Sequence, residues 1–344
     1  MNNKVNYIIF LGIFFIIPVG LATIASGRDI YSFSDTFQYY TYFESTLDYG
    51  VTYHYEPIFS FLTYVVSLIT SDYKNYFIFW FLSIFFSYVY SYKVILSSSL
   101  LNFTISDIKG MIVFTGVIIG SNWFYSVSVN GFRQGLSLGF VFISIVMLSR
   151  NDKRPLAILC LFISCMIHYS NFLFLPFFFI SNTIRKSSDK LFFLAIIFYY
   201  LGFTEELIKF TSNLTGVGIY ELIKFYVEEG SEHYLYVGFN SSFVIYLVVN
   251  FLIFKTSRKF MKSSRDVKLL DDLIISYTIL SIFYFVWGFG PFSNRFALPA
   301  WMFGAFIYSF ILLKLCVSNY IKAAGLLVIT FFSSVIYLYR LGYL

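Results

Sequence analysis

Long apolar runs, separated by short polar connections, occupy most of the 344-residue chain. A helix that crosses a bilayer needs about 20 largely apolar residues, and each of the clearest runs is predicted to be long enough to cross. They are Tyr7–Ile24, Phe77–Tyr92, Phe132–Leu148, Ser241–Phe254, Leu270–Trp287 and Phe296–Leu313. Because every backbone polar group in lipid must be satisfied within its own segment, these runs predict helices. The pattern predicts an all-α, polytopic membrane bundle of roughly 10 to 12 transmembrane helices.

Composition agrees with the membrane-protein class and limits the kinds of binding partner to expect. Hydrophobic residues make up 58% of the chain and charged residues 12%, about half the charged share of a soluble protein. The net charge is +6, but the bases gather at the ends of the apolar runs, so no nucleic-acid partner is expected. The three cysteines lie in apolar runs without a metal-ligand spacing, and no metal or cofactor is expected. Residues 1–344 are predicted to form a single transmembrane domain.

Charge also orients the connections between the runs. The segment 255–268 holds six Lys or Arg and one Asp, so the positive-inside rule predicts that it is cytoplasmic. Two acidic, aromatic loops, approximately 28–56 and 205–236, are predicted to lie outside. Their tyrosines suit an interfacial aromatic belt or stacking on sugar rings. In the stretches 57–109 and 155–190, the number of membrane crossings that the apolar runs give does not agree with the side predicted from the flanking basic residues. One broken or re-entrant helix in each stretch would remove this disagreement.

Arg133 is the most informative polar residue. Asn130 can cap a helix that begins near Gly131, which places Arg133 in the first turn. Free backbone N–H groups there attract an anion, and an arginine adds paired donors for phosphate oxygens. Since an arginine opposes the helix dipole at this end, the pattern predicts a bound anion that compensates it. The alternative is an arginine that extends to lipid headgroups. Glycines at every fourth position, with Gly135 and Gly139 continuing from Gly131, predict close helix packing.

Arg295 has the same position relative to its own apolar run. Two arginines at outer helix starts, with no matched acids beside them, suggest one strongly anionic ligand. An exposed surface arginine is the alternative for either residue alone. We therefore expect Arg133 and Arg295 to meet in one extracytoplasmic pocket and to bind a diphosphate.

Three further residues are candidates for proton transfer. His168 lies in a polar patch between two apolar runs, and an imidazole titrates near neutral pH; the alternative is a structural histidine. Asp35 shares a helix face with Tyr39 and Tyr42 at near i+4 and i+7 spacing. Glu56 precedes a proline that opens the next helix, where the helix dipole stabilises a carboxylate. It is either a helix cap or a general base or ligand for a sugar hydroxyl.

Taken in order, these short motifs resemble the EpsG-like branch of the Wzy-type polysaccharide polymerases over most of the chain. The motifs are Asp35-x3-Tyr39-x2-Tyr42, Glu56-Pro57-Ile58-Phe59, Arg133-Gln134, His168-Tyr169-Ser170 with Pro176 downstream, and Arg295. The resemblance implies a metal-independent glycosyltransferase of GT-C-like architecture in the bacterial cytoplasmic (inner) membrane. Such an enzyme joins undecaprenyl-pyrophosphate-linked oligosaccharide repeat units into a surface polysaccharide, such as O-antigen or exopolysaccharide. The reaction takes place at the outer face of the cytoplasmic membrane.

The resemblance also implies roles for single residues. Arg133 and Arg295 would bind the pyrophosphate leaving group, and Asp35, Glu56 or His168 would handle the acceptor hydroxyl, with the choice among the three open. The residues expected to contact substrate are Tyr39, Tyr42, Asn130, Gln134 and Tyr169. The implied partners are the lipid-linked oligosaccharide, as donor and as acceptor, membrane lipid and a chain-length regulator protein.

Other functions share part of this pattern. A transporter or flippase for lipid-linked oligosaccharide would use the same arginines, but it should show internal repeats, which the sequence lacks. A membrane acyltransferase acting on surface sugars would use His168 as its base, but no second catalytic motif is found. A non-enzymatic scaffold would leave the two arginines unexplained.

Overall fold

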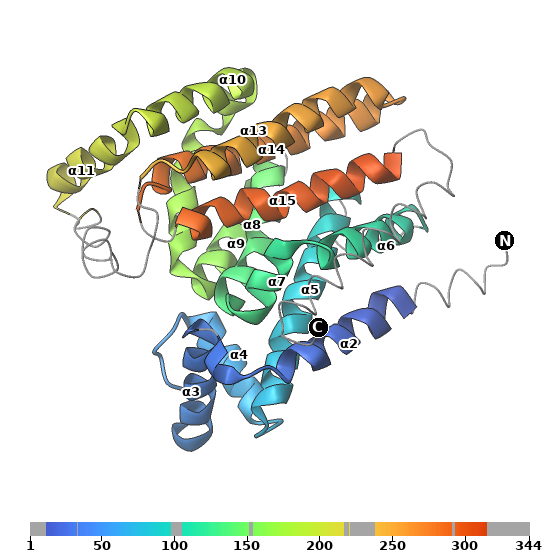
Figure 1. Cartoon of the computed structure of the whole chain (residues 1–344), viewed down its shortest axis with the longest axis vertical. Helices are drawn as coiled ribbons and strands as arrows, with labels where there is room; N and C mark the ends of the chain where they lie inside the picture. Colours follow the sequence, from blue (N-terminus) through green and yellow to red (C-terminus); the bar gives the residue numbers. More distant parts are fainter. Residues whose placement is uncertain are drawn as a thin grey trace. The chain divides into compact units, whose positions relative to one another are not determined.

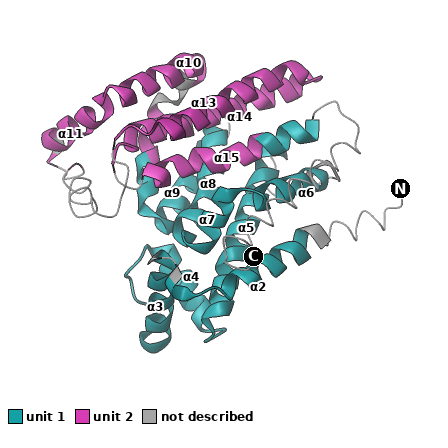
Figure 2. Cartoon of the chain, viewed as in Figure 1, with its two compact units in different colours: residues 1–173, 308–344 teal, residues 174–307 magenta. Residues whose placement is uncertain are grey.

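The computed structural model describes residues 12–32, 34–97, 105–150, 154–216, 220, 238–290 and 293–314. The chain divides into two compact units. The first comprises Met1–Leu173 with Tyr308–Leu344, and the second Phe174–Ile307 (Figure 2). Each unit is considered by itself below.

The regular elements in the described part of the chain are helices. Those of the first unit are η1 (Gly12–Ile16), α2 (Ile17–Ser26), η2 (Ile30–Ser32), α3 (Ser34–Tyr49), α4 (Pro57–Ser67), α5 (Tyr73–Ser97), α6 (Ile105–Ile119), α7 (Asn122–Val129), α8 (Phe132–Arg150), α9 (Arg154–Ile167) and η3 (Tyr169–Phe174) (Figure 1). The last residue of η3, Phe174, already belongs to the second unit. Those of the second unit are α10 (Leu175–Tyr200), α11 (Phe203–Thr215), α13 (Ser241–Ser257), η4 (Arg258–Phe260), α14 (Ser264–Trp287) and α15 (Ser293–Lys314), whose last turns belong to the first unit.

The all-helical membrane class predicted from the apolar runs is confirmed. Four helices among the described residues are long and apolar enough to cross a membrane, namely α5, α8, α14 and α15. The number rises to six if two bent pairs, α6 with α7 and α10 with α11, each count as one span. The prediction of roughly 10 to 12 spans exceeds this number. One reason is that the apolar stretches at Phe14–Ser26, Pro57–Ser67 and Arg154–Ile167 form helices shorter than a span.

The glycine stripe on α8 packs as predicted, and it holds this helix against α5 and α7. A β-carbon added at Gly135 would lie 3.0 Å from the Ile84 side chain of α5, and one at Gly139 would lie 2.8 Å from the Ser87 hydroxyl. The Ser91 hydroxyl of α5 also donates to the Gly139 carbonyl at 2.8 Å. Close contact on a small-residue face fixes the rotation of α8 about its axis. The direction of every side chain on α8 follows from that rotation.

Two chain breaks bring polar groups of the first unit together. Helix α4 begins at Pro57, with Glu56 as its extended N-terminal neighbour. Helix α9 ends at Ile167, and the chain continues as the 3-10 turn η3. The Asn171 side chain holds that turn by donating to the Ser164 carbonyl at 3.2 Å. The break expected in the polar patch after His168 is therefore present.

The predicted acidic outer loops contain more helix than the sequence pattern indicated. Residues 28–56 include helix α3, whose 16 residues present buried tyrosines. The loop expected at 205–236 begins within helix α11, which bends from α10 by 80°. Helix α11 ends at Thr215, and the residue that caps it, Gly216, has a φ of +66°, the left-handed conformation that favours glycine. Most of the remainder of this loop lies outside the described residues.

In the second unit, α10 packs along α14, and one hydroxyl joins several segments at one end of the unit. The Tyr199 hydroxyl lies 2.8 Å from the Gly238 carbonyl, 3.1 Å from the Tyr284 hydroxyl and 3.2 Å from the Asn240 amide nitrogen. Near the basic segment 255–268, Lys255 pairs with Asp189 at 2.7 Å, and Arg258 pairs with Asp271 at 3.1 Å. The bases predicted to be cytoplasmic are thus partly matched by acids.

Candidate active site

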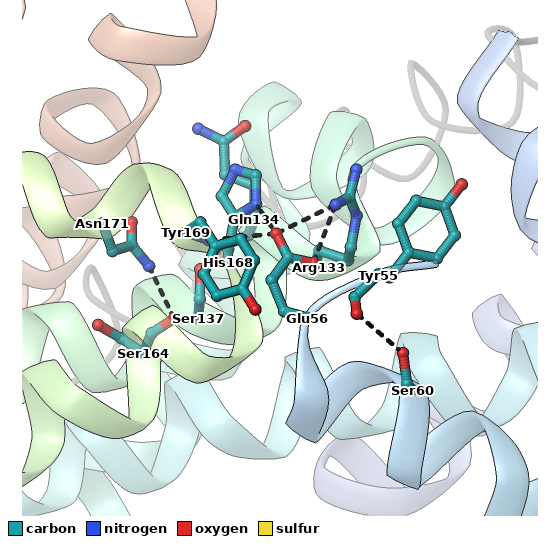
Figure 3. Close-up of polar contacts among 10 residues, drawn as sticks. All are labelled: Tyr55, Glu56, Ser60, Arg133, Gln134, Ser137, Ser164, His168, Tyr169 and Asn171. Carbon is teal, nitrogen blue, oxygen red and sulfur yellow. Dashed lines mark hydrogen bonds and ion pairs between the residues drawn. The ribbon is translucent and has the colours of Figure 1, made fainter. Parts of the chain in front are cut away.

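Three charged or ionisable side chains from distant segments converge in the first unit (Figure 3). Glu56 lies at the start of α4, Arg133 in the first turn of α8, and His168 directly after α9. The Arg133 Nη1 atom lies 2.9 Å from Glu56 Oε2 and 3.1 Å from Glu56 Oε1. The His168 Nδ1 atom lies 3.2 Å from Glu56 Oε1. The carboxylate therefore connects a permanent cation to an imidazole.

Glu56 is the centre of this arrangement. Its side chain is only 4% exposed, and it makes no capping hydrogen bond to α4, so the capping interpretation does not account for it. The Tyr169 backbone N–H donates to Oε1 at 3.1 Å. Burial alone would raise the pKa of the Glu56 carboxyl, but the His168 hydrogen bond and the Arg133 charge outweigh burial and lower it to about 2. Glu56 is consequently ionised at neutral pH.

Arg133 has a matched acid beside it, which corrects the expectation that it has none. The carboxylate of Glu56 supplies the negative charge that the helix start was predicted to require from a ligand. Both carboxylate oxygens face Nη1, so the ion pair does not use Nη2 or Nε. No described residue accepts a hydrogen bond from the buried Nε atom. With its side chain 23% exposed, Arg133 keeps donors for a further acceptor.

Two tyrosines complete the surroundings of the guanidinium. The Arg133 guanidinium carbon lies 4.3 Å from the centroid of the Tyr55 ring, a cation–π contact. The Tyr39 hydroxyl is hydrogen-bonded to Arg133, and the Tyr39 ring stacks on Phe132, with centroids 4.8 Å apart. Burial is the main cause that raises the pKa of Tyr55 to about 12. Both phenols therefore stay neutral and act as hydrogen-bonding and stacking groups.

The tautomer of His168 follows from its partner. An ionised carboxylate only accepts hydrogen bonds, so the Nδ1 atom that faces Glu56 must carry the proton. In the neutral ring, Nε2 is then the basic nitrogen. A carboxylate in this position orients the ring and stabilises the imidazolium that forms when Nε2 takes a proton. The pair has the geometry of a general base with an orienting acid.

Asp35 lies near the same group of residues. Its charge acts on Tyr39 and Tyr55, where it opposes the effect of the Arg133 charge on both hydroxyls. The structure thus brings together five of the predicted residues, Asp35, Tyr39, Glu56, Arg133 and His168, with Tyr169 contributing its backbone N–H. The Tyr169 ring itself is exposed and stacks with Phe172.

The other predicted substrate contacts have structural partners. The Tyr42 hydroxyl donates to the Thr52 carbonyl. Helix α8 begins at Phe132, and the Asn130 side-chain oxygen accepts the N–H of Thr36 at 3.2 Å. Asn130 therefore links α3 to the turn before α8 and does not cap α8 as predicted. Gln134 follows Arg133 in the first turn of α8, and its backbone carbonyl accepts the Ser137 hydroxyl at 2.9 Å (Figure 3). Substrate contact by these residues stays a prediction.

Arg295 belongs to the second unit, in the first turn of α15. Its side chain is exposed, and its backbone N–H donates to the Asn294 side chain at 3.0 Å. The prediction that Arg295 meets Arg133 in a common pocket remains a prediction.

Sequence reasoning did not single out Tyr55 or Arg28. Tyr55 directly precedes Glu56, but one tyrosine among many carries no signal of its own. Arg28 lies at the start of the segment 28–56, which was predicted to be an outer loop, and its side chain is only 5% exposed. Its isolation among acids in the segment 28–56 was the available signal, because a lone base in an acidic segment calls for a specific partner. Within the described residues, no group of three His, Cys, Asp or Glu side chains could hold a metal ion.

Comparison with known proteins gives one finding. The sequence model of the EpsG family matches residues 5–343, nearly the whole chain. No curated protein and no solved structure gives a significant match.

Proposed function

The chain belongs to the EpsG family, a Wzy-like polysaccharide polymerase family of multi-pass membrane proteins, and on that premise we propose the reaction that it catalyses. The proposed function is the polymerisation of undecaprenyl-pyrophosphate-linked oligosaccharide repeat units at the outer face of the bacterial inner membrane. The family supports a polysaccharide polymerase in general terms. The lipid carrier, the membrane face and the residue roles are our proposal.

One observation carries the residue roles, namely the Glu56 carboxylate held between Arg133 and His168. With Nδ1–H donated to Glu56, His168 can accept the proton of an acceptor hydroxyl at Nε2. Since the pKa of Glu56 is lowered to about 2, Glu56 is a poor general base at neutral pH. We assign proton transfer to His168 and orientation to Glu56. Asp35, at the edge of this group, is proposed to hold the acceptor sugar.

The proposed step balances as a displacement at the anomeric carbon of the growing glycan. The acceptor hydroxyl oxygen forms a bond to that carbon, and the bond from the carbon to the pyrophosphate oxygen breaks. The electron pair leaves with the lipid pyrophosphate, and the hydroxyl proton passes to His168 Nε2. Charge thus develops on the leaving group, where fixed donors stabilise the transition state more than the ground state.

Arg133 is proposed to supply such donors from the exposed part of its guanidinium, outside the ion pair that Nη1 makes. Glu56 neutralises part of the Arg133 charge, so a pyrophosphate with two or more negative charges calls for a second cation. We propose Arg295 for that role. Exposed tyrosines at the end of α3 and in its connection to α4, such as Tyr49 and Tyr53, are available to stack on sugar rings.

The test uses a strain that lacks the gene and carries it back on a plasmid. His168→Asn retains an N–H donor for Glu56 but cannot accept a proton, so it should abolish the polymer ladder on a glycan gel. Glu56→Gln should shorten or remove the ladder, while Glu44→Gln, a matched change on α3, should leave it normal. Membrane protein level is measured for every variant. Normal long chains from His168→Asn would overturn the assignment of the base.

The same gels separate the alternative functions. Loss of a polymerase leaves a single repeat unit capped and exported, whereas loss of a flippase leaves no unit outside. Loss of an acyltransferase leaves long chains that lack a modification. A strain whose gene deletion removes even the single exported unit, or that keeps full-length chains, would exclude the proposed polymerase.

A further inference from the structure

Arg28 is a buried cation outside the group of residues to which the proposed reaction assigns roles. It lies two residues beyond the end of α2, and its side chain is only 5% exposed. Its Nη1 atom donates to the Ala25 carbonyl at 2.6 Å, and its Nη2 atom to the Val129 carbonyl at 2.6 Å. The guanidinium carbon also lies 4.5 Å from the centroid of the Phe77 ring. A buried charge is costly unless it is well satisfied, so these contacts must compensate a large desolvation cost.

Several of these contacts converge on the turn between α7 and α8. Val129 is the last residue of α7, and its carbonyl also accepts the Thr36 hydroxyl at 3.0 Å. The Arg28 Nη2 atom lies 3.4 Å from that hydroxyl. Asn130, the next residue of the turn, accepts the Thr36 backbone N–H. Arg28 and Thr36 therefore join the end of α2, the start of α3 and the turn that precedes α8.

The first residue of α8 continues this connection to the site. The Phe132 ring lies 5.9 Å from the Arg28 guanidinium and stacks on the Tyr39 ring. Tyr39 is hydrogen-bonded to Arg133, the residue after Phe132. Thus Arg28 contacts both the backbone turn before α8 and the Phe132 ring, which in turn stacks on the tyrosine that is hydrogen-bonded to Arg133.

We propose that Arg28 is a positioning residue for Arg133. It fixes the start of α8 against α2 and α3, so that the Arg133 guanidinium stays beside Glu56 with its other donors directed to the leaving group. This inference rests on the proposed function. Arginine suits the task because its planar fork reaches separate acceptors at once, whereas a lysine has a single nitrogen.

The first test compares three variants with a control. Arg28→Met should reduce polymer formation by about 100-fold, since a misplacement of about 1 Å at a reacting group has an effect of that order. Arg28→Lys should lie between Arg28→Met and the natural protein. Thr36→Val, which removes only the hydroxyl, should give a smaller loss and guards against a failure of Arg28→Met to fold. The control is Arg150→Met, because Arg150 donates to the Ile95 carbonyl at the opposite end of the same helix α8.

The decisive measurement is a double-mutant cycle with Arg133→Lys, which keeps the charge but loses the planar fork. Purified variants in nanodiscs are assayed with lipid-linked repeat units, and activity is scaled to folded protein from a melting curve. If Arg28 acts through Arg133, its loss should have less than a threefold further effect in the Arg133→Lys background, below the roughly 100-fold effect alone. Losses that multiply would show a general structural role and overturn the proposal.

Failure of this inference differs from failure of the proposed function. If Arg133→Ala still makes long chains, the catalytic assignment fails and the cycle has no basis. If Arg133→Ala abolishes polymer but Arg28→Lys, Arg28→Met and Thr36→Val, all folded, match Arg150→Met, only the positioning role is overturned.

Discussion

Two helices of this protein begin with an arginine in the first turn, but the two arginines have different surroundings. Arg133 at the start of α8 is largely buried, paired with Glu56 and covered by the Tyr55 ring. Arg295 at the start of α15 is exposed, and its backbone N–H donates to the side chain of the preceding residue, Asn294. The same local sequence signature thus accompanies a built site in one unit and an accessible cation in the other. The position of an arginine on a helix indicates which backbone donors lie near it, but not which acid reaches it from elsewhere in the chain.

The largest expected effect is that of Arg133→Ala. It should abolish the polymer, a loss of about 100- to 1,000-fold for a principal charge-stabilising group. It should also destabilise the protein by about 3 kcal/mol, because the buried Glu56 carboxylate would lose the permanent cation beside it. Glycan gels and melting curves in detergent measure the two effects. A stable variant with a normal ladder would show that Arg133 is no more important than an exposed arginine, and would contradict the distinction between the starts of α8 and α15.

Arg295→Ala should separate activity from stability. We expect loss of polymer by about 100-fold, as for an exposed cation that meets the leaving group. The free energy of unfolding should change by no more than about 0.5 kcal/mol, because the side chain is exposed. The single lipid-linked unit should persist. A normal ladder would remove Arg295 from the proposed site, and a melting temperature as low as that of Arg133→Ala would show that the two environments are alike.

Acid should affect the Arg133 region through Glu56. Because the pKa of this carboxyl is lowered from 4.5 to about 2, folding favours its ionised form. The resulting stabilisation is complete above pH 4.5 and is lost as the pH falls from there toward 2.

A comparison of variants separates the pH-dependent stabilisation by Glu56 from that by the other carboxyl groups. In Arg133→Met, burial of Glu56 is no longer offset by the arginine, so folding favours the ionised carboxyl much less and the decline in melting temperature below pH 4.5 should become smaller. Arg295→Ala should follow the natural protein at every pH. Identical pH profiles for all three proteins would mean that the ion pair contributes nothing to stability.

The smallest expected effect is that of Tyr55→Leu. This change keeps most of the apolar contact but removes the ring that faces the Arg133 guanidinium, which is worth about 0.5 to 2 kcal/mol. Polymer yield should fall by roughly three- to tenfold, with the modal chain length shortened. Tyr64→Leu on α4 is a matched control. Equal yields from both variants would show that the cation–π contact does not matter for Arg133.

Much of the fold could be predicted because its signals are local. The apolar runs at Phe132–Leu148 and Leu270–Trp287 became helices with nearly the expected bounds. The glycine stripe on α8 packs closely, as its spacing indicates. Within the described residues, fewer helices than predicted have the length of a span, since short helices such as α4 have the composition of a span without its length. Hydropathy measures composition and does not show where a helix stops.

Several residues of the site could be predicted from the sequence, but their contacts could not. The motifs identified Glu56, Arg133 and His168 as candidates, and these three meet. Their pairing could not be predicted, because nothing in a single sequence states that a carboxylate at one helix start neutralises an arginine at another. Asn130 illustrates the same limit. Asparagine is a residue type that often caps helices, so it was predicted to cap α8, but its side chain accepts a hydrogen bond from Thr36 of α3.

The sequence by itself determined the helical membrane class, the family and the set of chemical groups available for catalysis. Those properties follow from the apolar period of the chain and from short motifs, and each is decided within a few turns of helix. Only the tertiary structure decided that Arg133 is an ion-paired arginine, that Glu56 is ionised and that His168 carries its proton on Nδ1. These properties depend on atoms separated by 77 and 112 positions in the chain, which are neighbours only after the helices pack.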